Sequence, residues 1–187
     1  MSQFRRNKTP KARVSTINLP SGLGGSIRGL CERSDGLIFA TAGSAVYCID
    51  VDSPQCKLVA GSSHEAGLKD GSGTEARFDR PCGLAIDSSG NVVVADSGNN
   101  CLRRISFKDP NKEAGEHRIT DLQHIHVSTY AGSASEGHVN GERDDARFSY
   151  PQGVAIDKFR NIYVSDSGNS CIRIISAQGN EKSVCSI

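Results

Sequence analysis

Two pairs of carboxylate and amide residues recur in the sequence at matching positions. Asn99 follows Asp96 by three positions, and Asn169 follows Asp166 in the same way. Because carboxylate and amide oxygens coordinate hard cations, one interpretation is a metal or ligand site. The other is that these side chains accept hydrogen bonds from nearby backbone N–H groups and cap a turn. The repetition of the motif Asp-Ser-Gly-Asn favours the turn.

Arginines are the next candidates for chemistry. Arg103 and Arg173 occupy matching positions, where they could form an anion-binding ring or make salt bridges with a neighbouring repeat. Near the N-terminus, Arg5 and Arg6 begin a basic segment that could contact phosphates. The candidate binding residues are Arg5, Arg6, Arg103, Arg173, His64 and His138.

The histidines are the remaining candidates for catalysis. They are His64, His117, His124, His126 and His138. All are expected in loops or in an outer strand, away from the segments that recur. The sequence also lacks a Gly-x-Ser-x-Gly motif, a phosphate-binding loop and a clustered carboxylate pair. We therefore predict no catalytic residue, no metal ligand and no cofactor.

The seven cysteines are scattered along the chain and form no Cys-x-x-Cys pair. This spacing does not suit zinc, and without a secretory signal it favours reduced thiols over a disulfide framework. Cys101 and Cys171 occupy matching positions in predicted strands. We interpret both as small buried apolar groups.

An internal repeat positions these residues. Residues 81–103 recur seventy positions later as residues 151–173, and more than half of the aligned residues are identical. The similarity extends upstream, because Ala-Arg-Phe precedes each copy at residues 76–78 and 146–148. A weaker copy at residues 29–49 keeps the strand order but lacks the Asp-Ser-Gly-Asn turn.

Each copy is a series of short apolar segments separated by turn residues, which is the pattern of antiparallel strands. Asp87 and Asp157 are expected in the first turn of their copies. The polar residues 107–123 are predicted to form an exposed extension or loop. The predicted strands are residues 83–86, 92–94, 101–105, 126–130, 154–156, 162–164 and 171–175, with 29–31, 37–40, 46–49 and 57–59 in the weak copy and single strands at 14–17 and 183–187.

The repeat resembles a known family. Its pattern is Pro-x-Gly-[Leu/Val]-Ala-Ile-Asp, then Asn-[Val/Ile]-x-Val-x-Asp-Ser-Gly-Asn, then [Leu/Ile]-Arg, and it is similar to the NHL repeat. The resemblance implies an all-β fold, a β-propeller with four antiparallel strands per blade, here about three blades of the usual six. Residues 1–25 are then a basic arm with one strand, and residues 26–187 are the propeller region. The expected blades are residues 26–61, 78–132 and 148–187.

Composition agrees with an all-β chain and excludes several classes of protein. The 187 residues are 36% hydrophobic, which excludes a wholly disordered chain, and the 20 glycines do not follow the period of collagen. No apolar segment is long enough to span a membrane. The first 31 residues carry six basic residues and no acidic residue. Such an arm is typical of a solvated terminus, or of binding to nucleic acid or anionic lipid, or of a mitochondrial presequence. We predict a cytoplasmic protein, with mitochondria as the alternative.

The resemblance also indicates function, because family members bind protein or RNA and a few relatives are lyases or hydrolases. A repeat rich in turns and poor in reactive groups favours a noncatalytic protein-interaction or scaffold module. Its expected contact surface is the loops at residues 61–75 and 132–145. RNA binding through the basic arm is the alternative, and a metal-dependent lyase or hydrolase is a third. Open ends of a partial ring predict a protein partner or self-association.

Overall fold

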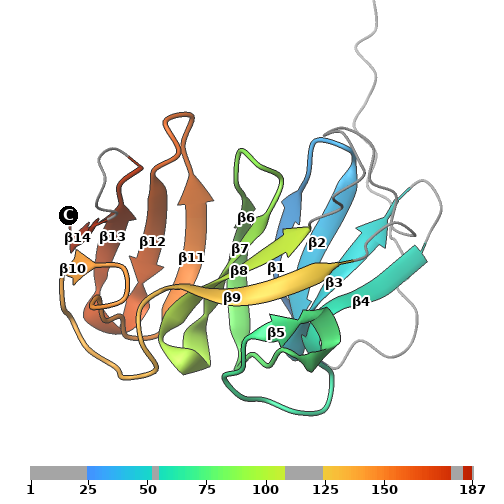
Figure 1. Ribbon diagram of the computed structural model, residues 1–187, viewed down its shortest axis with the longest axis horizontal. Coiled ribbons are helices and arrows are strands. Elements are labelled where there is room, and N and C mark those ends of the chain that lie inside the picture. Colours follow the sequence, from blue (N-terminus) through green and yellow to red (C-terminus); the bar gives the residue numbers. More distant parts are fainter. Residues whose placement is uncertain (1–24, 52–54, 108–123, 178–182, 187) are drawn as a thin grey trace, which may run out of the picture.

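The computed structural model describes residues 25–51, 55–107, 124–177 and 183–186. In these residues the chain forms three antiparallel sheets, which follow one another in sequence and lie side by side (Figure 1). We call them the first, second and third sheet. The prediction of an all-β fold is confirmed.

The strands are as follows. The first sheet has the order β1-β2-β3-β4, with β1 at Ile27–Glu32, β2 at Leu37–Ala42, β3 at Ser44–Asp50 and β4 at Gln55–Ser62. The second has the order β5-β9-β8-β7-β6, with β5 at Gly71–Ser72, β6 at Pro81–Ile86, β7 at Val92–Asp96, β8 at Cys101–Phe107 and β9 at Ile125–Ala131. The third has the order β10-β14-β13-β12-β11, with β10 at Gly141–Glu142, β11 at Pro151–Ile156, β12 at Ile162–Asp166, β13 at Cys171–Ile175 and β14 at Ser183–Ser186.

The short strands β5 and β10 were not predicted from sequence. Each adds two residues to the outer side of its sheet, where β5 pairs with β9 and β10 pairs with β14. A two-residue strand carries no alternating apolar pattern, so only its pairing reveals it. The predicted strand at residues 14–17 lies outside the described residues, as does the predicted loop at residues 107–123 except for Phe107, which is the last residue of β8.

Turn chemistry explains where the strands end. In the turn between β6 and β7, Asp87 Oδ1 accepts hydrogen bonds from the backbone N–H groups of Ser89 and Asn91, at 2.8 and 3.0 Å. Asp157 Oδ1 accepts the matching bonds in the third sheet, from Phe159 and Asn161 at 2.8 and 2.9 Å. These side chains close the turn by the Asx-type bonding expected from sequence.

The second predicted turn is a single turn of 3-10 helix in both copies. These helices are η2 at Ser97–Asn99 and η4 at Ser167–Asn169, and η1 at Gly73–Glu75 follows β5. The residue that follows η2 is Asn100 and the one that follows η4 is Ser170, and both have a left-handed backbone, with φ of 52° and 53°. The chain therefore reverses between the second and third strands of each repeat and places a buried Asp at the reversal.

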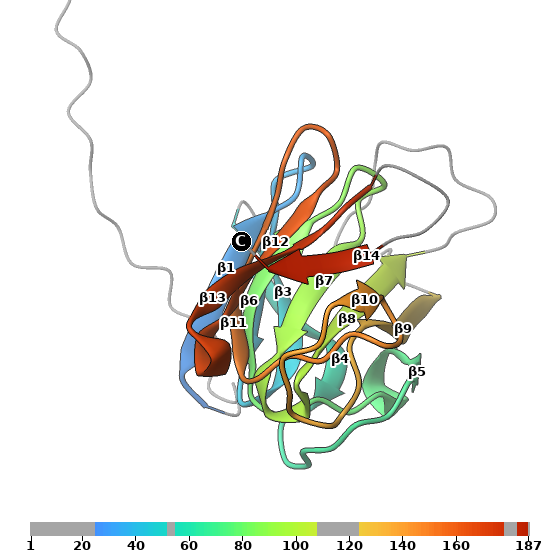
Figure 2. The same cartoon turned by 90° about the vertical axis from the view of Figure 1, so that its left-hand side faces the viewer.

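Apolar side chains fill the space between neighbouring sheets, and Figure 2 views the stack from the side of the third sheet. All five residues of β7 are buried. Because its side chains alternate between faces, Val92 and Val94 pack in the cluster shared with the first sheet, whereas Val93 and Ala95 pack in the cluster shared with the third. The second sheet is thus covered on both faces, which explains why its central strand is apolar throughout.

Candidate functional site

A buried arginine organises the outer part of the second sheet. Arg103 is fully buried. Its Nη1 donates to Asp96 Oδ2 at 2.9 Å and to the carbonyl of Arg77 at 2.8 Å. Its Nη2 donates to Asp70 Oδ1 at 2.6 Å and to the carbonyl of Lys69 at 2.9 Å. One guanidinium therefore links strand β8 to two points on the chain segment that precedes β6.

Asp96 is the inner partner of this arginine. Its Oδ1 accepts from the backbone N–H of Asp79 at 2.8 Å, and its Oδ2 accepts from Asn99 Nδ2 at 2.8 Å. The same Asn99 amide donates to the carbonyl of Gly67 at 2.8 Å. Burial opposes the ionised form more strongly than these bonds and Arg103 favour it, and it raises the pKa of Asp96 to about 6.

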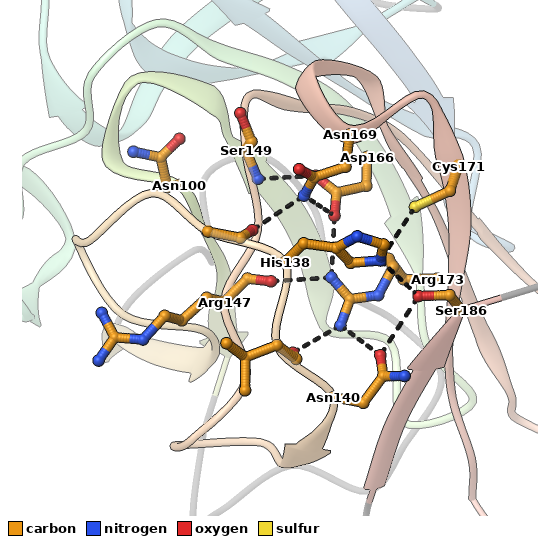
Figure 3. Close-up of polar contacts among 12 residues, drawn as sticks. Asn100, His138, Asn140, Arg147, Ser149, Asp166, Asn169, Cys171, Arg173 and Ser186 are labelled. Atoms are coloured by element: carbon orange, nitrogen blue, oxygen red, sulfur yellow. Dashed lines mark hydrogen bonds and ion pairs between the residues drawn. The ribbon is translucent and has the colours of Figure 1, made fainter.

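The third sheet repeats this arrangement (Figure 3). Arg173 is fully buried, and its Nη1 donates to Asp166 Oδ2 at 2.9 Å and to the carbonyl of Arg147 at 2.8 Å. Its Nη2 donates to the carbonyl of Val139 at 2.7 Å and to Asn140 Oδ1 at 2.8 Å. Each of these partners lies seventy positions after its counterpart in the second sheet.

The turn residues repeat in the same way. Asp166 Oδ1 accepts from the backbone N–H of Ser149 at 2.7 Å, and Asn169 Nδ2 donates both to Asp166 Oδ2 and to the carbonyl of Gly137, each at 2.8 Å. Asp96 and Asp166 are therefore structural, as expected, but they act mainly as partners of buried arginines and of distant backbone groups. The prediction that they cap their own turns by Asx-type hydrogen bonds is wrong, because neither side chain makes a capping hydrogen bond to the 3-10 helix that follows it.

The Ala-Arg-Phe motif completes each arginine site. The guanidinium of Arg103 lies 5.0 Å from the ring centre of Phe78, and that of Arg173 lies 5.0 Å from the ring centre of Phe148. Within the described residues, the Nε atoms of both arginines are buried and have no hydrogen-bond partner. Stacking on a phenyl ring supplies a favourable contact for the guanidinium face that hydrogen bonds cannot supply.

The consequence of both networks is a braced outer loop. In the second sheet the carbonyls of Gly67 and Lys69 are held by Asn99 and Arg103. Between them, Leu68 is 43% exposed. The third sheet holds the matching loop, in which Val139 is 42% exposed. Each loop presents an apolar side chain to solvent from a backbone that is fixed from beneath.

The two networks differ at one charged position. Asp70 carries a second carboxylate next to Arg103, whereas its counterpart Asn140 is an amide. Asp70 also accepts from the backbone N–H of Thr129 at 3.0 Å. Burial opposes the charge on Asp70, but the bond from Thr129 and the charge of Arg103 outweigh it and lower the pKa of Asp70 below its ordinary value.

The third sheet places a hydroxyl group and an imidazole ring in the corresponding space. Ser186 Oγ lies 3.3 Å from Asn140 Oδ1 and 2.8 Å from His138 Nε2. The same histidine nitrogen lies 3.8 Å from Cys171 Sγ. Figure 3 shows the contacts of His138 with Cys171 and Ser186. The contacts of His138 with Cys171 and Ser186 were not predicted, because the three residues belong to separate segments of the chain.

The structure corrects one prediction about the arginines. Arg103 and Arg173 have no exposed surface, and their ion pairs lie within one sheet. They are neither an accessible anion-binding ring nor a bridge to a neighbouring sheet. His64 and His138 are exposed in the outer loops, as expected. Arg5 and Arg6 lie outside the described residues.

Other candidate chemistry is sparse in the described ranges. No group of three or more His, Cys, Asp or Glu side chains there could hold a metal ion. Cys101 is buried, as predicted, and burial raises the pKa of its thiol to about 12. Cys171 is half-buried, so the same prediction is wrong for it. No described helix is long and apolar enough to cross a membrane.

Comparison with protein families identifies the repeated unit. The NHL repeat matches residues 78–105 and 148–175, which contain the buried Asp, Asn and Arg of each network. Both segments are NHL repeats. The loops at residues 61–75 and 132–145 lie outside the matched NHL segments, although the side chains that brace them lie inside.

Known proteins with similar sequences are much longer chains. The Arabidopsis thaliana protein SUPPRESSOR OF QUENCHING 1, chloroplastic, is 26% identical over 159 residues, or 81% of this chain and 14% of the relative. NHL repeat-containing protein 2 from Homo sapiens is 29% identical over 160 residues, or 77% of this chain and 21% of the relative. The chain thus spans about a fifth or less of the length of these two relatives.

A solved structure agrees with the fold. A structural genomics protein of unknown function from Bacteroides thetaiotaomicron superposes with a TM-score of 0.64 at 26% identity, covering 78% of this chain and 34% of that one. The three NHL-type sheets form a partial β-propeller of three blades, as the resemblance implied.

Proposed function

We propose that this chain is a noncatalytic protein-interaction module whose contact surface is formed by the outer loops at residues 61–75 and 132–145. NHL repeats are generally protein-interaction modules. The observation that carries the proposal is the bracing of these loops by Arg103 and Arg173 beneath exposed apolar side chains.

Bracing matters for binding because a mobile loop loses conformational entropy when a partner immobilises it. Holding a loop in its bound shape before association reduces this cost. Here the carbonyls at residues 67, 69, 137 and 139 are each fixed by a side chain from the buried network. Leu68 and Val139 therefore present apolar surface at little further entropic cost.

Affinity capture from cell extract tests the proposal. The test variant combines Leu68→Glu with Val139→Glu, which places two charges on the contact surface without altering the network beneath. Phe159→Glu is the matched control, because Phe159 is 58% exposed but lies in the turn between β11 and β12. Proteins retained by the wild type and by the control, and lost with the double variant, are the expected result.

Two outcomes would contradict the proposal. One is equal retention of every captured protein by the double variant and the wild type. The other is loss of binding with the control variant alone, which would move the contact surface to the opposite end of the sheets. Far-UV circular dichroism of all three proteins establishes that each is folded.

RNA binding is the second candidate, and the specific observation behind it is the charge of the N-terminal arm. Six basic residues occur in the first 31 positions without an acidic residue. Phosphate contacts weaken steeply as salt rises. Retention on immobilised RNA that falls with salt and is lost when residues 1–13 are deleted would support this function; no retention at low salt would exclude it.

A further inference from the structure

Matching positions in the second and third sheets differ sharply in exposure. Leu102 in β8 is fully buried, whereas its counterpart Ile172 in β13 is 46% exposed. Likewise, Ala95 is buried and Ser165 is exposed. The third sheet covers Leu102 and Ala95, which pack in the cluster between the two sheets. The outer face of the third sheet is therefore the same surface without its cover.

The first sheet shows the complementary difference. Leu84 in β6 packs in the cluster between the first and second sheets and is 5% exposed. Its counterpart in β1, Leu30, is 61% exposed. Leu84 follows Gly83, and Leu30 follows Gly29. We call β1, β6 and β11, which carry these matching glycines, the inner strands. The free face of β1 is thus a surface that, in the second sheet, meets the preceding sheet.

The inner strands follow a strict packing rule. A Cβ at Gly29 would collide with the carbonyl oxygen of Cys82, and a Cβ at Gly83 would collide with that of Gln152. In each case a glycine of one sheet lies against a backbone carbonyl of the next sheet. That carbonyl belongs to the residue that immediately precedes the matching glycine of the next sheet. Only a glycine permits this approach of two backbones.

The third sheet carries this glycine without its partner. A Cβ at Gly153 would meet only the side chain of Ser165, from its own sheet. By the same rule, the missing partner is a carbonyl just before a glycine. Arg28, which precedes Gly29 in β1, occupies that position in the first sheet.

We propose that a second copy of this chain docks head to tail, with its first sheet on the outer face of the third sheet. Arg28 of the second copy would then place its carbonyl against Gly153, and Leu30 would join Ile172 in a new apolar cluster. The inference rests on the proposed interaction role and names one partner, at a surface separate from the outer loops.

A second copy is the occupant that the internal interfaces favour. The chain already contains two junctions of this kind. One joins the first sheet to the second, and the other joins the second sheet to the third. The free face of β1 and the outer face of the third sheet hold the two halves of a third junction. Such a head-to-tail contact is heterologous, so it closes a ring when the rotation allows and otherwise extends a chain. Either arrangement removes Leu30 and Ile172 from water, which is favourable.

The oligomeric state of the full chain tests the proposal. We expect light scattering coupled to size exclusion to give a mass of two or more chains of 19.9 kDa, rising with concentration. Ile172→Glu and Leu30→Lys, tested separately, should each give a monomer, because each would bury an unpaired charge in the contact. Phe159→Glu is the control and should assemble like the wild type.

Mixing the two monomeric variants separates head-to-tail docking from other contacts. In one junction of the mixed pair, the unchanged Leu30 of one variant meets the unchanged Ile172 of the other. In the other junction, the introduced lysine meets the introduced glutamate in place of these two apolar residues. We therefore expect the mixture to regain the mass that each variant lost alone.

Each remaining outcome overturns the inference. A wild type that is monomeric at every concentration would show that no second copy docks. Assembly that survives Leu30→Lys but not Ile172→Glu would indicate a contact between two third sheets. Neither result would touch the proposed function, because Leu68 and Val139 are unchanged in all of these proteins.

Discussion

The second and third sheets are built from nearly the same sequence, yet they differ in two physical respects. Among the residues that the structure describes, the second sheet pairs its buried arginine with two carboxylates, Asp96 and Asp70, whereas the third pairs Arg173 with Asp166 alone. The second sheet is also covered on both faces, and the third on one. The comparison separates what the repeat itself determines from what its neighbours add.

Charge compensation is the part that the repeat determines. Removing a buried arginine from water is expensive unless a carboxylate lies within hydrogen-bond distance. Asp96 and Asp166 supply that carboxylate at 2.9 Å in each copy. Asp70 adds a further one in the second sheet only, from a side chain that is 47% exposed.

The largest expected effect follows from this difference. Asp166→Asn keeps the shape of the side chain but leaves Arg173 without any carboxylate among its contacts, which is expected to cost about 3–5 kcal/mol of unfolding free energy. Asp96→Asn should cost clearly less, because Asp70 still faces Arg103. Urea unfolding followed by circular dichroism measures both.

A double variant sharpens this test. With Asp70→Asn in the background, Asp96→Asn should become as costly as Asp166→Asn, since Arg103 then also lacks a carboxylate. Equal costs for Asp96→Asn with and without Asp70→Asn would mean that Asp70 compensates none of the charge. Hydrogen exchange of the amides at residues 67–72 and 137–142 locates the loss in the loop that each arginine braces.

The next effect concerns the packing of a neighbouring sheet against the glycine of each repeat. Gly83→Ala would drive a Cβ into the carbonyl of Gln152, and relieving such overpacking costs about 1–3 kcal/mol. Gly153→Ala meets only the side chain of Ser165, which can move, so its cost should be smaller. Thermal unfolding at concentrations where the chain is monomeric compares them. Equal losses of thermal stability would show that the close approach of the Gln152 carbonyl does not make Gly83→Ala more costly than Gly153→Ala.

Much of the fold could be predicted because the repeat marks its own boundaries. Asp87 and Asp157 identify a turn by residue type, and the apolar segment at residues 92–94 identifies a buried strand. Pairing partners far apart in sequence could not be found in this way. The strands β5 and β10 exist only because β9 and β14 lie beside them.

The site was only partly predictable for a related reason. Sequence showed that Arg103 and Arg173 are equivalent, but surface and buried arginines look alike in a sequence. Their fixed distance of seven positions from a repeated Asp was a signal that the two pair across adjacent strands. The role of residues 67–70 carried no such signal, because their contacts use backbone carbonyls that every residue has.

The smallest effect tests the position that distinguishes the two networks. Asp70→Asn makes the second sheet resemble the third, and it should cost about 0.5–1 kcal/mol at neutral pH, as is typical of a partly exposed ion pair. Because the folded pKa of Asp70 lies below its ordinary value of 3.8, its contribution is present above that pH and disappears as pH falls through the folded pKa. The stability difference between wild type and variant should therefore close in acid. The reciprocal change, Asn140→Asp, should stabilise the third sheet by a similar amount with the same pH dependence, and a difference that persists in acid would show that the two positions differ by shape and not by charge.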